Sequence, residues 1–66
     1  MEDIKVRRGY GKSSVRLVSV DAKRWVAMHM TLERLKDDTF KVETDILDEL
    51  IEIFERSGLI VYEIER

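Results

Sequence analysis

The stretch RRGYGKSS, residues 7–14, combines side chains that bind phosphate with a backbone that permits close approach. Arg7, Arg8 and Lys12 supply positive charge around Tyr10, which lies between two glycines. Cations contact the phosphates of a nucleic acid, and an aromatic ring stacks on its bases. Glycine has no Cβ and also supplies turn geometry. The stretch therefore predicts either a nucleic-acid-binding site or only a hairpin turn between basic strands.

The segments on either side of this stretch extend the candidate surface. Successive side chains of a strand point to opposite faces, so with Ile4 and Val6 directed inward, Lys5 points outward. Arg16 joins it from the neighbouring strand, and Trp25 joins it if the segment that follows is also a strand. We expect single-stranded or duplex nucleic acid as the partner. The candidate nucleic-acid-binding residues are Lys5, Arg7, Arg8, Tyr10, Lys12, Arg16 and Trp25.

Catalytic and metal chemistry are not expected. The chain has no cysteine, His29 is its single histidine, and no nucleophile elbow surrounds any serine. A phosphate-binding loop and a dinucleotide fingerprint are both missing. The carboxylates of 45–55 fit a solvated helix face, and Asp37 with Asp38 lacks the spacing of a calcium loop and fits a turn. We predict a protein that is not an enzyme and holds no cofactor or metal.

Charge is divided unevenly along the chain. Residues 1–24 hold seven bases and three acids, a net charge of +4, whereas residues 25–66 hold five bases and eleven acids, a net charge of −6. Such asymmetry predicts a basic pole and an acidic pole on one surface, unless the two halves interleave in the fold.

Length and composition limit the class of protein. With 66 residues we expect one domain spanning 1–66, whose small core is stabilised either by good packing or by oligomerisation. Pro, Cys, Asn and Gln are absent and 39% of residues are charged, a pattern reported for thermophile proteins. No apolar run approaches the ~20 residues of a membrane span. We expect a cytoplasmic protein without a membrane partner.

The clearest elements lie near the C-terminus. The segment 45–57 is predicted as an amphipathic helix, which Thr44 or Asp45 can cap and which Gly58 can end in a left-handed cap. The segment 59–65 alternates in type and is rich in β-branched and aromatic residues, which predicts a strand. The apolar face of the helix consists of Ile46, Leu47, Leu50, Ile51 and Phe54.

Two strands are predicted near the N-terminus. Residues 4–6 and 14–20 are rich in isoleucine, valine and leucine, and the Gly-Tyr-Gly turn lies between them. We expect these strands to pair as an antiparallel hairpin.

The middle of the chain, residues 22–35, fits either a helix or a strand. As a helix it begins at Asp21, and Trp25, Met28, Leu32 and Leu35 line one face, but Glu33 and Lys36 crowd that face. As a strand, its apolar residues alternate without a break, but few of them are β-branched. We prefer the strand, followed by a turn into a further strand that contains Phe40 and Val42.

The fold class that follows is α+β. A small antiparallel sheet carries the N-terminal hairpin and the final strand, and the helix 45–57 packs on one of its faces. The side chains expected to point at that helix are Ile4, Val6, Val26, Met28, Met30, Leu32, Phe40, Val42, Ile60, Tyr62 and Ile64.

A second function follows from the other face of this sheet. One helix covers only one face, so apolar residues on the opposite face imply a protein partner or a second copy of the chain. In this hypothesis the protein is an interaction subunit or homodimer without a nucleic-acid role. Its interface residues are Val18, Val20, Trp25, Leu59 and Val61.

Overall fold

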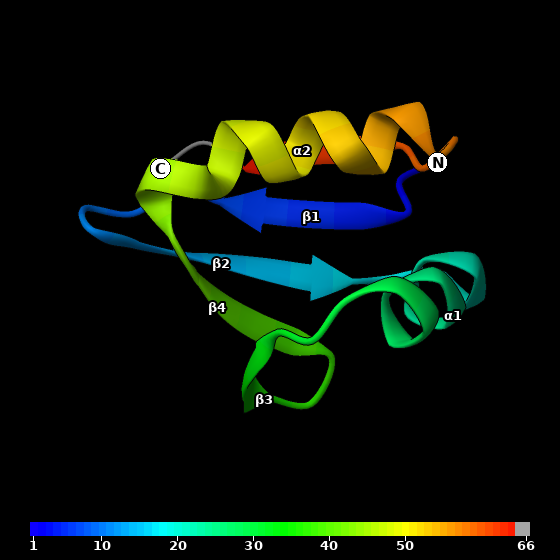
Figure 1. The fold of residues 1–66 in the computed structure, drawn as a ribbon, viewed down its shortest axis with the longest axis horizontal. Helices are drawn as coiled ribbons and strands as arrows, with labels where there is room; N and C mark the ends of the chain where they lie inside the picture. The colour runs from blue at the N-terminus through cyan, green and yellow to red at the C-terminus, as the bar shows by residue number, and fades with distance from the viewer. Residues whose placement is uncertain (65–66) are drawn as a thin grey trace.

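The protein is described by a computed structural model that covers residues 1–64 (Figure 1). Five strands and two α-helices follow one another in these 64 residues. Within the described residues no helix is long and apolar enough to cross a membrane. The elements are β1 (Ile4–Arg7), β2 (Lys12–Leu17), α1 (Val20–His29), β3 (Glu33–Lys36), β4 (Thr39–Glu43), the 3-10 turn η1 (Thr44–Ile46), α2 (Leu47–Arg56) and β5 (Val61–Ile64).

The five strands form one sheet in the order β3-β4-β2-β1-β5. The pairs β1–β2, β2–β4 and β3–β4 are antiparallel, whereas β5 pairs with β1 in parallel. The α+β class, the N-terminal hairpin, the C-terminal helix and the final strand are confirmed. The purely antiparallel sheet is a correction: α2 returns the chain beside β1 and β5 then runs in the direction of β1, so the sheet is mixed.

The core lies on one face of the sheet, beneath both helices. In Figure 1, α2 lies alongside β1 and in front of β5, and α1 lies near the end of β2. Alternate residues of the strands meet the buried stripes of the helices, which is how an α+β domain encloses its apolar side chains. The core consists of Ile4, Val6, Val15, Leu17, Ala22, Val26, Val42, Leu47, Leu50, Phe54 and Leu59.

The helix predicted for 45–57 is present as η1 followed by α2. Asp48 and Glu49 lie in its first turn and Arg56 in its last, an arrangement that the helix dipole favours. Gly58 ends it with a φ of 89°, in the left-handed region where glycine is favoured, as predicted.

The preferred strand interpretation of 22–35 is wrong for residues 22–29, which belong to the helix α1 (Val20–His29), and only its end, in Glu33–Lys36, is a strand. Ser19 caps it: its hydroxyl accepts a hydrogen bond from the backbone N–H of Ala22 at 3.0 Å. The segment forms a helix although its apolar residues alternate, because it is rich in residues with high helix propensity. Met28 consequently points to solvent rather than to the core.

The side chains of the last strand, β5, point to the opposite faces of the sheet from those predicted. Val61 pairs with Ile4 on the core side, and Tyr62 pairs with Lys5 on the outer side. Leu59 fixes this register, because its N–H bonds to the carbonyl of Phe54 and its side chain is only 7% exposed. A one-residue shift of a strand exchanges its two faces, which is the error made for Ile60, Tyr62 and Ile64.

The hairpin loop is tied to the start of η1 by a closed set of hydrogen bonds. Thr44 Oγ1 donates to the carbonyl of Gly9 at 2.8 Å, and the N–H of Gly9 donates to Ser13 Oγ at 3.0 Å. The two hydroxyl oxygens are 2.7 Å apart, so Ser13 donates to Thr44. A Cβ on Gly9 would collide with the carbonyl of Lys12, so this position requires glycine.

Candidate nucleic-acid interface

The face of the sheet away from the helices carries mainly charged side chains. We call it the open sheet face. The registers place on it six basic residues and two acidic ones, so its local charge is positive although the chain as a whole carries −2. The basic residues are Lys5, Arg7, Lys12, Arg16, Lys36 and Lys41, and the acidic ones are Glu33 and Glu43.

Arg16 is the centre of this charge. It lies directly opposite Lys5 on β1, while Arg7 and Lys41 both lie opposite Ser14, two residues before Arg16 in β2. Side chains diagonal to one another on a sheet are about 7–8 Å apart, within reach of long residues. Lys5, Arg7, Arg16 and Lys41 therefore form one basic cluster across three neighbouring strands.

Three members of the basic cluster have no ion-pair partner among the residues that the structure describes. Lys41 forms an ion pair with Glu33 at 3.6 Å. Lys5, Arg7 and Arg16 form no ion pair within residues 1–64. Like charges directly opposite on a sheet are destabilising, so Lys5 beside Arg16 costs stability in the free protein. An anion bound between them would relieve that repulsion.

An aromatic ring borders the basic cluster. Tyr62 of β5 pairs with Lys5 and remains 50% exposed, and Ile64 follows it beside Arg7. Sequence reasoning missed Tyr62 because it placed this side chain in the core. The signal that could have found it is Leu59, whose burial after Gly58 sets the alternation of β5.

Arg8 belongs to a different side of the molecule. Its Nε donates to Glu63 Oε2 at 2.7 Å and its Nη2 donates to Asp48 Oδ1 at 2.7 Å. The hydrogen bonds to Glu63 and then Asp48 raise the pKa of Arg8 further above its ordinary value, and the hydrogen bond from Arg8 lowers the pKa of Glu63. Arg8 thus ties the hairpin to α2 and β5, and its guanidinium is occupied.

We predict that Arg8→Gln removes an acid-sensitive contribution to stability. Because the pKa of Glu63 lies below its usual 4.5 in the folded state, the contribution is present above that value and is lost as pH falls through the lowered pKa. Urea unfolding of wild type and variant across acidic and neutral pH should therefore show a difference that shrinks towards low pH.

Lys12→Gln provides the control for this measurement. Lys12 forms a single exposed ion pair with Glu43 at 3.3 Å, and such pairs contribute little. A difference for Arg8→Gln that stays constant at every pH would show that Arg8 acts through packing and not through charge.

The remaining predicted residues are dispersed by the fold. Tyr10 is fully exposed at the tip of the hairpin, and Lys12 lies at the start of β2 on the open sheet face. Trp25 lies on α1, on the helix side, where it stacks on His29 at 4.5 Å and contacts the edge of Phe54 at 5.8 Å. Because residues 20–29 form a helix, Trp25 does not lie on the open sheet face.

The predicted protein interface is also broken up. Leu59 and Val61 do not face outward: Leu59 is part of the core and Val61 packs against it, because the register of β5 differs from the prediction. Val18 and Val20 remain exposed around the start of α1, and Trp25 is half-buried. These five side chains do not form one surface on the open sheet face.

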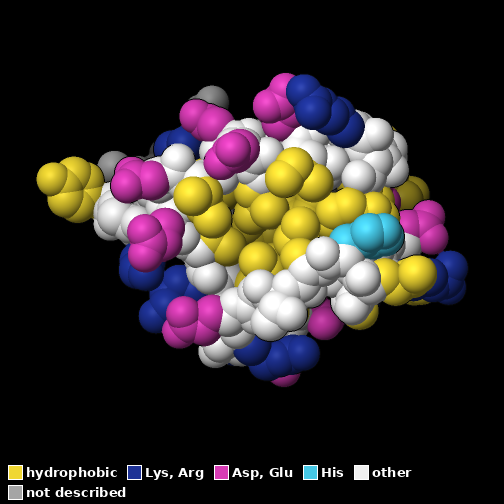
Figure 2. Space-filling model, in the orientation of Figure 1, with side chains coloured by type: hydrophobic (Ala, Val, Ile, Leu, Met, Phe, Trp, Pro, Cys, Tyr) yellow, Lys and Arg dark blue, Asp and Glu magenta, His cyan; other side chains and the backbone are white. Residues whose placement is uncertain are grey.

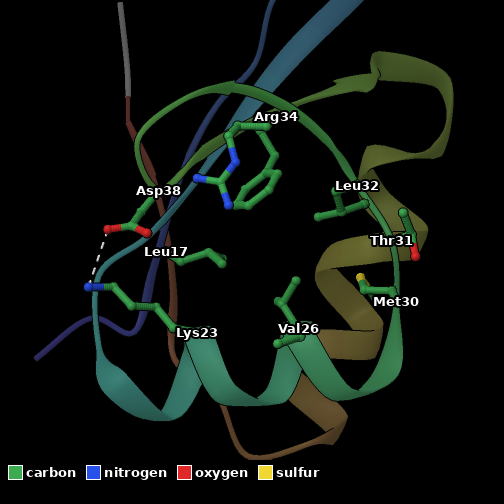
Figure 3. A pocket seen from close by; sticks show the side chains of 10 residues that line it. Leu17, Lys23, Val26, Met30, Thr31, Leu32, Arg34 and Asp38 are labelled. Carbon is green, nitrogen blue, oxygen red and sulfur yellow. Dashed lines mark ion pairs between the residues drawn. The ribbon is translucent and has the colours of Figure 1, made fainter.

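A pocket of about 320 Å³ lies on the helix side, between α1 and the β3–β4 hairpin (Figure 3). Val26, Met30 and Leu32 line it, and the guanidinium of Arg34 lies across from them, 5.2 Å above the ring centroid of Phe40. An ion pair between Lys23 and Asp38 at 3.3 Å occupies one edge of the pocket. The basic cluster is on the opposite side of the sheet and contributes nothing to it.

Comparison of the chain with protein-family models, with curated proteins and with solved structures found no match.

Proposed function

We propose that the protein is a non-enzymatic nucleic-acid-binding module that uses its open sheet face. The observation that carries the proposal is the adjacency of three cations without ion-pair partners in residues 1–64, Lys5, Arg7 and Arg16, to the half-exposed ring of Tyr62. Cations that follow a backbone and a ring that stacks on a base are the two requirements of single-strand binding. The setting that we propose from composition is the cytoplasm of a thermophile.

Single strands are the favoured ligand. The bases of a single strand can be spread over a sheet and stacked on an aromatic side chain, whereas the bases of a duplex are already stacked on one another. Asn and Gln, the amides that read adenine, are absent from the chain. Binding is therefore expected to depend on phosphate charge and stacking, with little base preference.

Titration of labelled oligothymidylate, single-stranded and as a duplex with oligodeoxyadenylate, tests the proposal by fluorescence anisotropy at increasing salt. We expect tighter binding of the single strand. Neutralisation of three phosphates should give a slope of about −2 for the logarithm of the association constant against that of the salt concentration. Absence of binding at low salt, or binding that salt does not weaken, would overturn the proposal.

The contribution of Tyr62 can be measured separately. Tyr62→Leu removes the ring and keeps an apolar side chain at this position, so we expect affinity for the single strand to fall about 5- to 150-fold. Tyr62→Phe retains the stacking surface and should bind like wild type. Equal losses in the two variants would show that the hydroxyl group, and not stacking, is what matters.

A protein partner is the second candidate function. The sequence predicted an apolar interface on the open sheet face, but Leu59 and Val61 lie on the core side of the sheet. What favours a partner is instead the apolar surface that remains exposed on the helix side.

A further inference from the structure

The helix side of the molecule exposes a continuous apolar surface. Figure 2 shows it as a yellow area between α2 and α1, with the single histidine at one end. Two isoleucines of η1 and α2 remain substantially exposed, Ile46 at 46% and Ile53 at 41%. Trp25 of α1 is half-buried on the same side, where it contacts the edge of Phe54. Large exposed apolar areas on a small domain mark sites of interaction.

The exposed residues have helical spacing. Ile46 and Ile53 lie at i and i+7, beside the buried stripe that contains Leu47, Leu50 and Phe54. The apolar arc of α2 is therefore wider than the sheet can cover. We call Ile46, Ile53 and Trp25 the α2 apolar surface.

Acidic residues line the solvent side of this surface. Asp45, Glu49 and Glu52 come next around α2, and all three are exposed. Glu52 is paired with Arg56 at 2.9 Å, whereas Asp45 and Glu49 form no ion pair within residues 1–64. The magenta atoms in Figure 2 lie along this margin of the yellow area. The surface thus combines an apolar strip with an uncompensated negative border.

We propose that the α2 apolar surface docks a basic amphipathic helix of another protein. Apolar side chains of such a helix, spaced at i, i+3, i+4 and i+7, fit beside Ile46 and Ile53. Lysine or arginine residues on its flank pair with Asp45 and Glu49. This inference does not rest on nucleic-acid binding, because the docked helix lies on the other side of the sheet from the basic cluster.

Charge argues against a nucleic acid and against a second copy of the chain as the occupant of this surface. A nucleic acid would bring phosphates against Asp45 and Glu49. In a symmetric dimer the same patch faces itself, so the acidic border of one copy would meet that of the other. A partner that carries both apolar and basic side chains satisfies the two features of the surface at once.

Isothermal titration with a designed peptide tests the inference. The probe is a helical peptide of about 18 residues with leucines at i, i+3, i+4 and i+7 and lysines elsewhere. We expect it to bind the full chain and to shift the emission of Trp25, the only tryptophan. Ile46→Gln with Ile53→Gln should weaken binding about tenfold or more, and Glu49→Lys should weaken it and reduce its salt dependence.

Ile60→Gln is the matched control, since Ile60 is an exposed isoleucine in the connection to β5. It should bind the peptide as wild type does. The inference is overturned by an equal loss in Ile60→Gln, by equal binding of a scrambled peptide, or by no binding at all. It is also overturned if the free protein dimerises and Ile46→Gln with Ile53→Gln makes it monomeric, because a second copy then occupies the surface. Circular dichroism of each variant verifies that the fold is intact.

Discussion

Replacement of Phe54 by alanine should lower the free energy of unfolding by about 3–5 kcal/mol. Phe54 is completely buried in α2, packs within the core against the sheet, and meets the edge of Trp25 from α1. The loss combines the transfer of the ring to water with the cavity left between the two helices. A single core in a chain of this size rarely supplies more than about 3–5 kcal/mol, so the variant should be largely unfolded at room temperature.

Urea denaturation followed by circular dichroism measures this effect. Met28→Ala is the control, because Met28 is a large apolar residue of α1 that is exposed, and a change there should stay within about 0.5 kcal/mol. Similar stabilities for the two variants would show that the contact of α2 with the sheet is not what holds the fold together.

Reversal of two charges in the basic cluster should produce the largest change in binding. Arg7→Glu combined with Arg16→Glu removes two of the three cations without ion-pair partners in residues 1–64 and leaves Lys5 between two acids. We expect affinity for a single-stranded oligonucleotide at low salt to fall by about ten- to a hundredfold, and the salt slope to flatten. The fold should persist, because both side chains are exposed. In addition, Arg16→Glu replaces the repulsion between Lys5 and Arg16 by an attraction.

Arg24→Glu combined with Arg56→Glu makes the same change in net charge on the helices. Arg24 is exposed on α1, and Arg56 forms only an exposed pair with Glu52. This control should retain most of the affinity. If both double variants lose affinity equally, binding depends on the total charge of the protein and not on the open sheet face.

Elements specified by local chemistry were predictable from the sequence. The apolar stripe around Leu47, Leu50 and Phe54 defined the C-terminal helix, and Gly58 defined its end, since both depend only on neighbouring residues. Residues 22–35 were harder because their apolar positions satisfy two periods at once. The hydroxyl of Ser19 caps the helix, whereas the sequence pattern indicated Asp21 as its cap.

The candidate site was predictable where strand alternation sufficed. Lys5, Arg7 and Arg16 lie together on the open sheet face, as their alternation with buried residues indicates. Tyr62 and Lys41 join them only through pairing with distant strands, which no local pattern encodes. The position of Arg8 was likewise unpredictable, because its acceptors come from α2 and β5, far away in the sequence.

The parallel pairing of β1 with β5 has a consequence for how the chain reaches its native state. Ile4 lies beside Val61, so this contact closes a loop that contains nearly every other element. The entropy of such a closure must be lost before the contact is gained, whereas the β1–β2 hairpin and the β3–β4 hairpin form between near neighbours. During synthesis on the ribosome, one edge of β1 therefore stays open until β5 has emerged. That edge is the place where the nascent protein is most exposed to mispairing with another chain.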